Sequence, residues 1–325
     1  ETPQDAWLIR AYGWCLHDGL QATRQANDVA GMRKLLAEFE SLDIGEGDDD
    51  ASLRGARENW RGRVAPEGGG PALAVLIQQA RVQSDAGNRQ EALRLLREAV
   101  RQFPELPQAS TSLAWEIERA LKDVVSQQVV DGQAVRALLQ EYGRLDGIEK
   151  PSLLHSMILT RATQGAESFR TYISFLRWWN SATFRDEDFQ RYMPAGAEQS
   201  YDSLVERVIK AVHKASKNEK NPENIAWATE FVGTHYARFP EQEWFEYYYG
   251  QLLVQTGDLE RARELIVPIV RRKQGDFWAW DTLGATYGAE DGEKKLACLC
   301  KSLLCRTKDS SFLVNVHTEL GALLV

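Results

Sequence analysis

The sequence predicts an all-α protein, built as an α-solenoid of antiparallel helical hairpins. First, apolar residues recur at steps of three and four along nearly every long segment, which is the period of a helix and not of a strand. Second, small residues repeat every 34 positions, as in Gly250 and Gly284 or Ala228 and Ala262. Third, the best strand candidate, VVSQQVV at 124–130, has no partner segment with turn chemistry.

Composition narrows the class of protein. The 325 residues allow one large domain or two ordinary ones, and 43% hydrophobic with 26% charged residues is usual for a folded soluble protein. No run of 18 apolar residues occurs, so we expect no transmembrane helix and no membrane partner. The first residues, ETPQDAWLIR, lack the pattern of a signal peptide. A net charge of −8 argues against a wholly basic nucleic-acid binder but leaves room for a local basic patch.

The first 65 residues are expected to form an N-terminal helical segment. Residues 5–24 carry apolar side chains at helical spacing, and Asp28 is placed to cap a second helix. The stripe of that second helix consists of Met32, Leu35, Leu36 and Phe39. An acidic, glycine-spaced break at 43–50 precedes a third helix over 52–63. The sequence PEGGGP at 66–71 then predicts a flexible joint.

Residues 71–200 are expected to form a helical repeat region that becomes irregular after residue 107. The sequence GNRQEALRLLREAV at 87–100 is visibly similar to GDLERARELIVPIV at 257–270. Beyond 107 no 34-residue register is found. In the segment 168–179, one helical stripe predicts a core, and Trp178 lies off that stripe and is expected to be exposed. The stripe consists of Phe169, Tyr172, Ile173, Leu176 and Trp179.

Residues 201–325 are expected to form regular repeats. In the middle copy, a helix over 244–255 meets a turn at Gly257-Asp258, where glycine suits a left-handed cap, and a second helix covers 259–272. Pro268 is expected to kink that second helix. The next copy opens with Trp280-x-x-Leu283-Gly284-x-x-Tyr287, which we interpret as core packing and not as a ligand-stacking site.

A 34-residue period with this pattern resembles the tetratricopeptide repeat. The resemblance covers residues 73–106 and 209–308. It implies that the first helix of each hairpin lines a concave surface that binds a protein or peptide.

A second resemblance covers more of the chain. The segments DAWLIRAYGWCLHDGL, RDEDFQRYM and KLACLCKSLLC are similar to bacterial proteins of TOTE conflict systems, which place a helical-repeat region before an S1/cold-shock-like domain. This resemblance implies a role in defence against invading nucleic acid, with the present chain as the interaction arm. The chain ends on an uncapped apolar helical pattern, so we expect the natural protein to continue beyond Val325.

The repeat register predicts a partner-binding face that is cationic at one end and aromatic at the other. Such a face suits a peptide with acidic and apolar side chains, or a C-terminal carboxylate. The alternative is a plain solvated helix face. The predicted residues are Lys210, His213, Lys214, Lys217, Trp244, Tyr247, Gln251, Trp278 and Asp281.

Catalytic and metal sites are not predicted. Cys298, Cys300 and Cys305 do not have the spacing of a zinc site, so we interpret them as buried structural thiols. Together with the remote Cys15 they form no disulfide framework, which favours the cytoplasm. The five histidines form no tight ligand pair, and the acidic loop at 43–50 lacks the last ligand of a calcium loop.

The sequence therefore predicts a protein–protein interaction scaffold without catalytic residues, metal or cofactor. The alternative is a nucleic-acid-associated module that acts through the local basic patch, and nucleic acid is accordingly a secondary partner. The oligomeric state is not predicted.

Overall fold

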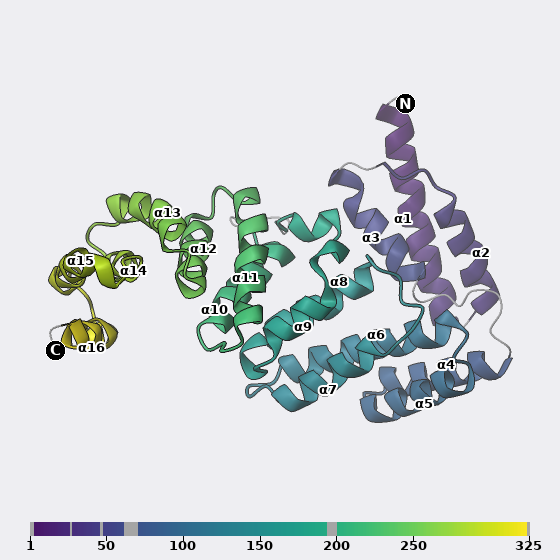
Figure 1. The fold of residues 1–325 in the computed structure, drawn as a ribbon. Helices are drawn as coiled ribbons and strands as arrows, with labels where there is room; N and C mark the ends of the chain where they lie inside the picture. Colours follow the sequence, from purple (N-terminus) through teal and green to yellow (C-terminus); the bar gives the residue numbers. More distant parts are fainter. Residues whose placement is uncertain (1–2, 27, 46–47, 62–70, 194–199, 324–325) are drawn as a thin grey trace. The chain divides into compact units, whose positions relative to one another are not determined.

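A computed structural model describes residues 3–26, 28–45, 48–61, 71–193 and 200–323 (Figure 1). These residues contain sixteen α-helices and no named strand, which confirms the all-α prediction. The candidate strand at 124–130 is instead the last residues of a helix and the turn that follows it. One isolated antiparallel bridge joins Tyr192 and Tyr201. In the described ranges, no helix has both the length and the apolar character needed to cross a membrane.

The chain forms two compact units. The N-terminal unit comprises Glu1–Phe169 and Ala182–Gln190, and the C-terminal unit comprises Arg170–Ser181 and Arg191–Val325. The N-terminal unit holds α1 (Pro3–Gln25), α2 (Val29–Glu40), α3 (Asp48–Arg61), α4 (Pro71–Asp85), α5 (Arg89–Gln102), α6 (Pro107–Val125), α7 (Gly132–Gly143) and α8 (Leu153–Gln164). The C-terminal unit holds α9 (Tyr172–Trp179), α10 (Leu204–Ser216), α11 (Pro222–His235), α12 (Glu243–Thr256), α13 (Leu259–Arg272), α14 (Phe277–Ala285), α15 (Gly292–Leu304) and α16 (Val314–Leu323). The division at 1–65, 71–200 and 201–325 stays a prediction.

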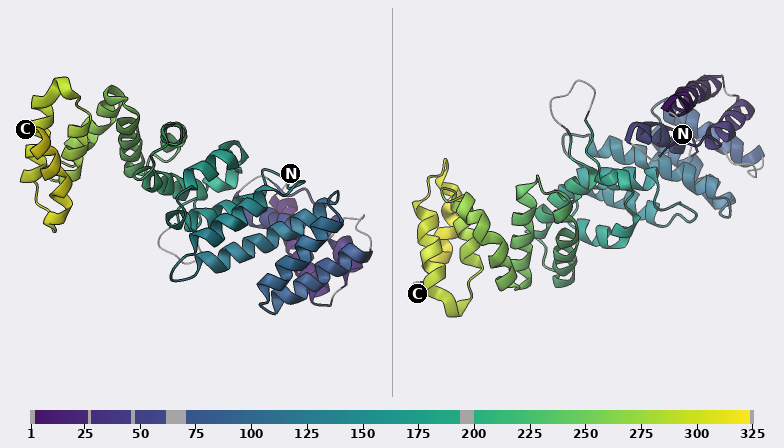
Figure 2. Two further views of the ribbon diagram at one scale, coloured as in Figure 1. Left: turned by 60° about the horizontal axis from the view of Figure 1, so that its bottom comes forward. Right: turned by 90° about the horizontal axis from the view of Figure 1, so that it is seen from above.

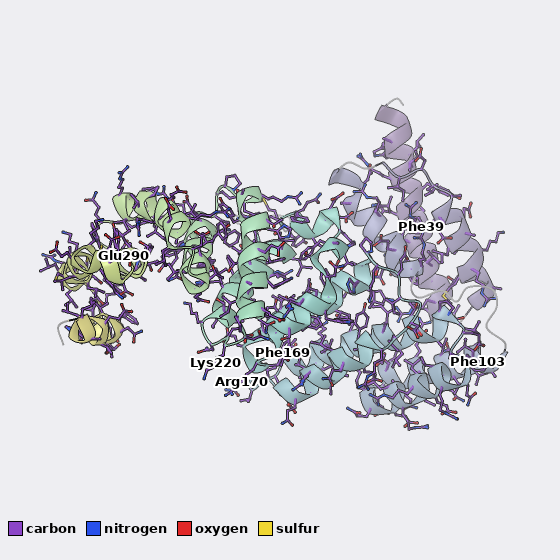
Figure 3. All side chains as sticks on the ribbon, in the orientation of Figure 1. Phe39, Phe103, Phe169, Arg170, Lys220 and Glu290 are labelled. Atoms are coloured by element: carbon purple, nitrogen blue, oxygen red, sulfur yellow. The ribbon has the colours of Figure 1, made fainter. Side chains whose placement is uncertain are left out.

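The first three helices pack around their own hydrophobic core. Leu20, Phe39, Leu53 and Trp60 are almost fully buried there, and Figure 3 labels Phe39. As predicted, Asp28 caps α2: its Oδ1 accepts a hydrogen bond of 2.8 Å from the backbone N–H of Gly31. The predicted joint at 66–71 lies outside the described residues, except that α4 begins at its last position.

The helices α4 and α5 pair over the segment expected to be the early repeat, and α6, α7 and α8 have 19, 12 and 12 residues. Gly87, in the turn between α4 and α5, has φ +80°, a left-handed conformation that favours glycine. Further along, a buried polar network fixes the segment 182–190 against α8. His155, which is 0% exposed, contacts Tyr142 Oη at 2.8 Å and Thr183 Oγ1 at 3.0 Å, and Ser156 Oγ donates to Asp188 at 2.7 Å.

In the C-terminal unit, α10 with α11, α12 with α13 and α14 with α15 form successive antiparallel hairpins (Figure 2). The middle hairpin agrees closely with the prediction. Gly257 ends α12 in the left-handed conformation at φ 82°, Asp258 accepts from the N–H of Arg261, and α13 covers 259–272. Although Pro268 lies inside α13, the helix is continuous on both sides of it.

Close helix packing inside the hairpins explains the repeated glycines. A Cβ added at Gly250 would lie 2.7 Å from Ile266 Cδ1, and one added at Gly284 would lie 3.3 Å from Cys298 Cβ. Trp280 and Tyr287 are partly buried and pack against the core cluster of α12 to α15, in agreement with the core interpretation. The stripe predicted over 169–179 is buried, whereas Trp178 is 46% exposed.

We expect Gly250→Ala to destabilise the C-terminal unit by about 1–3 kcal/mol, because the new methyl group overpacks against fully buried Ile266. Ile266→Val removes the clashing Cδ1. Urea denaturation should therefore show that the double variant loses less stability than the two single changes together. Gly275→Ala is the control, since nothing lies within 4 Å of its added Cβ. Additive losses in the double variant would contradict this packing.

Candidate partner-binding face

The nine predicted residues lie on, or directly after, the first helices of the three C-terminal hairpins. Lys210, His213 and Lys214 are on α10 with Lys217 as its C-cap; Trp244, Tyr247 and Gln251 are on α12; Trp278 and Asp281 are on α14. Contacts join these helices. His213 Nε2 lies 2.6 Å from Gln251 Oε1, which joins α10 to α12, and the ring of Trp278 lies 4.8 Å from that of Tyr247, which joins α12 to α14.

His213 and Tyr247 lie beneath the face and not on it. They are 7% and 8% exposed, respectively. Tyr247 Oη contacts Thr282 Oγ1 at 2.9 Å and accepts a 2.8 Å hydrogen bond from Gln251 Nε2. The expectation that these two side chains contact a partner directly is therefore corrected. Their amphipathic rings instead pack against neighbouring side chains and form hydrogen bonds between helices. Their role is to position the residues above them.

Burial also changes the charge of the basic end. Burial, with a smaller contribution from nearby Lys217, lowers the pKa of His213 to about 4. The hydrogen bond that His213 donates to Gln251 Oε1 opposes this shift, but the ring is still neutral at pH 7. Lys210 Nζ is 2.5 Å from Asp202 Oδ2, so its charge is paired. Lys214 and Lys217 are exposed. Of the four residues predicted to be basic, these two lysines provide the exposed positive charge.

The aromatic end is an exposed tryptophan supported by partly buried rings. Trp244 is 46% exposed, and its ring centroid lies 5.0 Å from that of Trp278. The adjacent recess between α12, α13 and α14 measures only about 10 Å³. That volume is far below the range of small-molecule pockets, so this end presents an open surface.

Asp281, on α14 beside Tyr247, is a half-buried carboxylate that makes no hydrogen bond or ion pair with any residue the structure describes. Burial, together with the negative charge of Glu319 and against the positive charge of Lys295, raises its pKa to about 6. A half-buried charge without a partner costs free energy. Asp281 is therefore the residue on this face with the clearest need for a ligand.

Two contributors to the site were not predicted. Tyr248 stacks on His213 with ring centroids 3.9 Å apart, and Thr282 Oγ1 lies within hydrogen-bond distance of Tyr247 Oη. The two occupy the same repeat position, 34 residues apart, so the register that located the other residues also contains them.

Of the four cysteines, one is buried. Cys298 is buried, but Cys15 and Cys300 are exposed and Cys305 is half-buried, so the interpretation as buried structural thiols holds only for Cys298. The reason is the helical spacing, which places Cys300 on the opposite side of α15 from Cys298. Among the described residues, no group of three or more His, Cys, Asp or Glu side chains is arranged to hold a metal ion.

Comparison with known proteins adds little about binding. Residues 243–325, which include α12 to α16, match the family model described as a domain of unknown function, DUF7017. No curated protein matches the chain. Among solved structures, one titled "Crystal structure of YrrB: a TPR protein with an unusual peptide-binding site" is 15% identical, with a TM-score of 0.21 over 70% of this chain and 83% of that one. At that TM-score the similarity carries no inference about this protein's ligand.

Substitutions at Tyr247 and Trp244 should have different effects on stability, because the first residue is a buried support and the second lies at the surface. Tyr247→Ala should lower the free energy of unfolding by about 3–5 kcal/mol, because it empties a buried site and removes the link to Thr282. Trp244→Ala, at a 46% exposed residue, should cost about 1 kcal/mol or less. Thermal and urea unfolding measure both. Equal losses for the two variants would show that Tyr247 is not the buried support described here.

Asp281→Asn should stabilise the protein at pH 7. The pKa of Asp281 is raised from 3.8 to about 6 on folding, so the folded state binds the extra proton and stability falls as pH rises from about 4 to about 6. Removing the charge should raise the free energy of unfolding by on the order of 1–3 kcal/mol at pH 7 and should leave it unchanged near pH 3.5. Asp276→Asn is the control, because its side chain caps nothing at the start of the same helix. A pH-independent difference between Asp281→Asn and the parent protein would contradict this assignment.

Proposed function

We propose that this protein is a non-catalytic interaction scaffold whose C-terminal unit binds a peptide segment along α10, α12 and α14. The second helix of one hairpin packs against the first helix of the next, as α11 does on α12 and α13 on α14, and the first helices also contact one another through side chains. The candidate face combines exposed aromatic surface with separated charges of opposite sign. Aromatic side chains are the usual energetic anchors of protein interfaces.

The observation that carries the proposal is the carboxylate of Asp281, which no described residue pairs. It lies one helical turn after Trp278 on α14, and the ring of Trp278 packs on that of Trp244. A protein retains a destabilising charge where function needs it. A lysine, an arginine or an amino terminus of a partner would supply the missing cation, and the neighbouring rings would cover an apolar residue beside it. Lys214 and Lys217, on the α10 side, suit an acidic residue further along the same peptide.

We further propose a bacterial conflict system as the setting of this scaffold, in the cytoplasm. Support comes from the similarity of residues 5–20, 185–193 and 295–305 to the helical arms of such proteins. In that setting the bound peptide would belong to another component of the defence assembly.

The test is selection of random peptides displayed on phage against the purified chain. We expect enriched sequences to pair a large apolar or aromatic residue with a nearby lysine or arginine. In fluorescence anisotropy, Trp244→Ala and Asp281→Asn should each weaken a selected peptide about ten-fold. Binding should also be weaker at pH 5 than at pH 7, because protonation of Asp281 removes its charge, and Asp281→Asn should abolish that difference.

Trp178→Ala is a matched control, since Trp178 and Trp244 are both 46% exposed in the same unit. An equal loss of affinity in this control would place the binding site elsewhere. The alternative function has a different signature: RNA bound at low salt, released by about 200 mM salt and indifferent to Asp281→Asn would favour the nucleic-acid module.

A further inference from the structure

A second site of different chemistry lies in the N-terminal unit, between α1 and α2 on one side and α4, α5 and α6 on the other. The cavity there measures about 370 Å³, within the range of small-molecule pockets. A neighbouring recess of about 560 Å³ shares Arg24, Gln78, Arg81 and Asp85 with it. These residues line both spaces, so they form the boundary between them.

Arginine is the dominant polar residue of the cavity. Arg24, Arg33, Arg81 and Arg119 all line it and are half-buried. Two of them, Arg24 and Arg81, make no hydrogen bond or ion pair within the part of the chain that the structure describes. Partial burial of a guanidinium without a counter-ion is unfavourable, because the group loses hydration and gains nothing in exchange.

Other half-buried arginines of the same unit show the usual solution. Arg89 contacts Glu116 at 2.7 Å, Arg119 contacts the other oxygen of Glu116 at 2.8 Å, and Arg161 contacts Glu118 at 2.8 Å. Each therefore has a carboxylate from this chain. Arg24 and Arg81 differ from them in having no such carboxylate among the described residues, and the cavity that they line leaves room for an anion that does not belong to the chain.

The charge of the lining fits a dianion. Against its four arginines stand two acids, Asp85 and Glu116, which leaves an excess of two positive charges. Glu116 is already paired twice, so its oxygens do not compete for the free guanidiniums. A phosphate monoester carries close to two negative charges at neutral pH, and arginine binds it through forked, bidentate hydrogen bonds.

Beside the charged residues, the lining has a polar part, made of Gln78, Ser84, Gln108 and Ser112, and an apolar part. Met32, Leu96 and Trp115 are buried, and Ile77 is partly buried, so they form a wall beside the arginines. A bare inorganic anion leaves this wall without contacts, whereas an organic body fills it. From the cavity, its unpaired guanidiniums and its apolar wall, we propose that the N-terminal unit binds a small phosphate monoester with an aromatic or apolar body.

Isothermal titration calorimetry of the full chain with phenyl phosphate, inorganic phosphate and phenol tests the proposal. Phenyl phosphate should bind saturably, about ten-fold or more tighter than inorganic phosphate, and phenol should not bind measurably. Arg24→Gln and Arg81→Gln should each weaken phenyl phosphate at least about ten-fold. Arg94→Gln removes an equal charge from an exposed pair on α5 and should leave binding unchanged.

Circular dichroism and thermal unfolding check that each variant is folded. Where a glutamine variant does not fold, Arg→Lys at the same position is the second variant. Lysine keeps the positive charge but lacks the bidentate geometry of the guanidinium, so binding should weaken to a smaller extent. Absence of saturable heat with phenyl phosphate overturns the proposal. So does equal affinity for phenyl phosphate and inorganic phosphate, or an equal loss in Arg94→Gln. None of these outcomes depends on peptide binding by the C-terminal unit.

Discussion

The close approach of paired helices at a glycine is the constraint on which the C-terminal unit depends. At Gly250 the space for a side chain is taken by Ile266, and Ala262, fully buried on α13, keeps the same crossing narrow. Gly284 and Cys298 repeat the arrangement in the next hairpin. Because each second helix packs so tightly on its own first helix, the first helices of successive hairpins come within side-chain reach of one another. The contacts of His213 with Gln251 and of Tyr247 with Thr282 follow from that spacing.

These contacts divide the candidate face into two layers. The lower layer is a chain of hydrogen bonds and stacked rings through His213, Gln251, Tyr247 and Thr282, and it contains no net charge at pH 7 because His213 is neutral. Satisfied buried networks of this kind hold their members in one arrangement. The upper layer, with Trp244 at its centre, therefore rests on a rigid support, which reduces the entropy lost when a partner binds.

Local signals in the sequence were sufficient to predict the helices and the turns. Gly257 was predicted as a left-handed cap and Asp28 as a helix cap because the chemistry of each acts within a few residues. Depth of burial was not predictable in the same way. Lys214 and Tyr248 share one repeat position, yet the first is exposed and the second is half-buried under His213, because the neighbouring hairpin covers only one of them. The period of the sequence identifies one face of a helix, but the packing of the neighbouring hairpin determines which part of that face remains exposed.

A comparison of two carboxylates in the C-terminal unit supports the binding role that we propose for Asp281. Glu206 is 0% exposed, a burial that by itself would raise its pKa; Arg191, Ser203 and Gln242 nevertheless donate hydrogen bonds to it and lower the pKa to about 2. This unit thus compensates a carboxylate buried more deeply than Asp281. Burial instead raises the pKa of Asp281 to about 6, and no comparable donors from the described residues oppose that shift. Since Asp281 is only half-buried and follows Trp278 by one turn of α14, a donor from outside the chain has room to reach it.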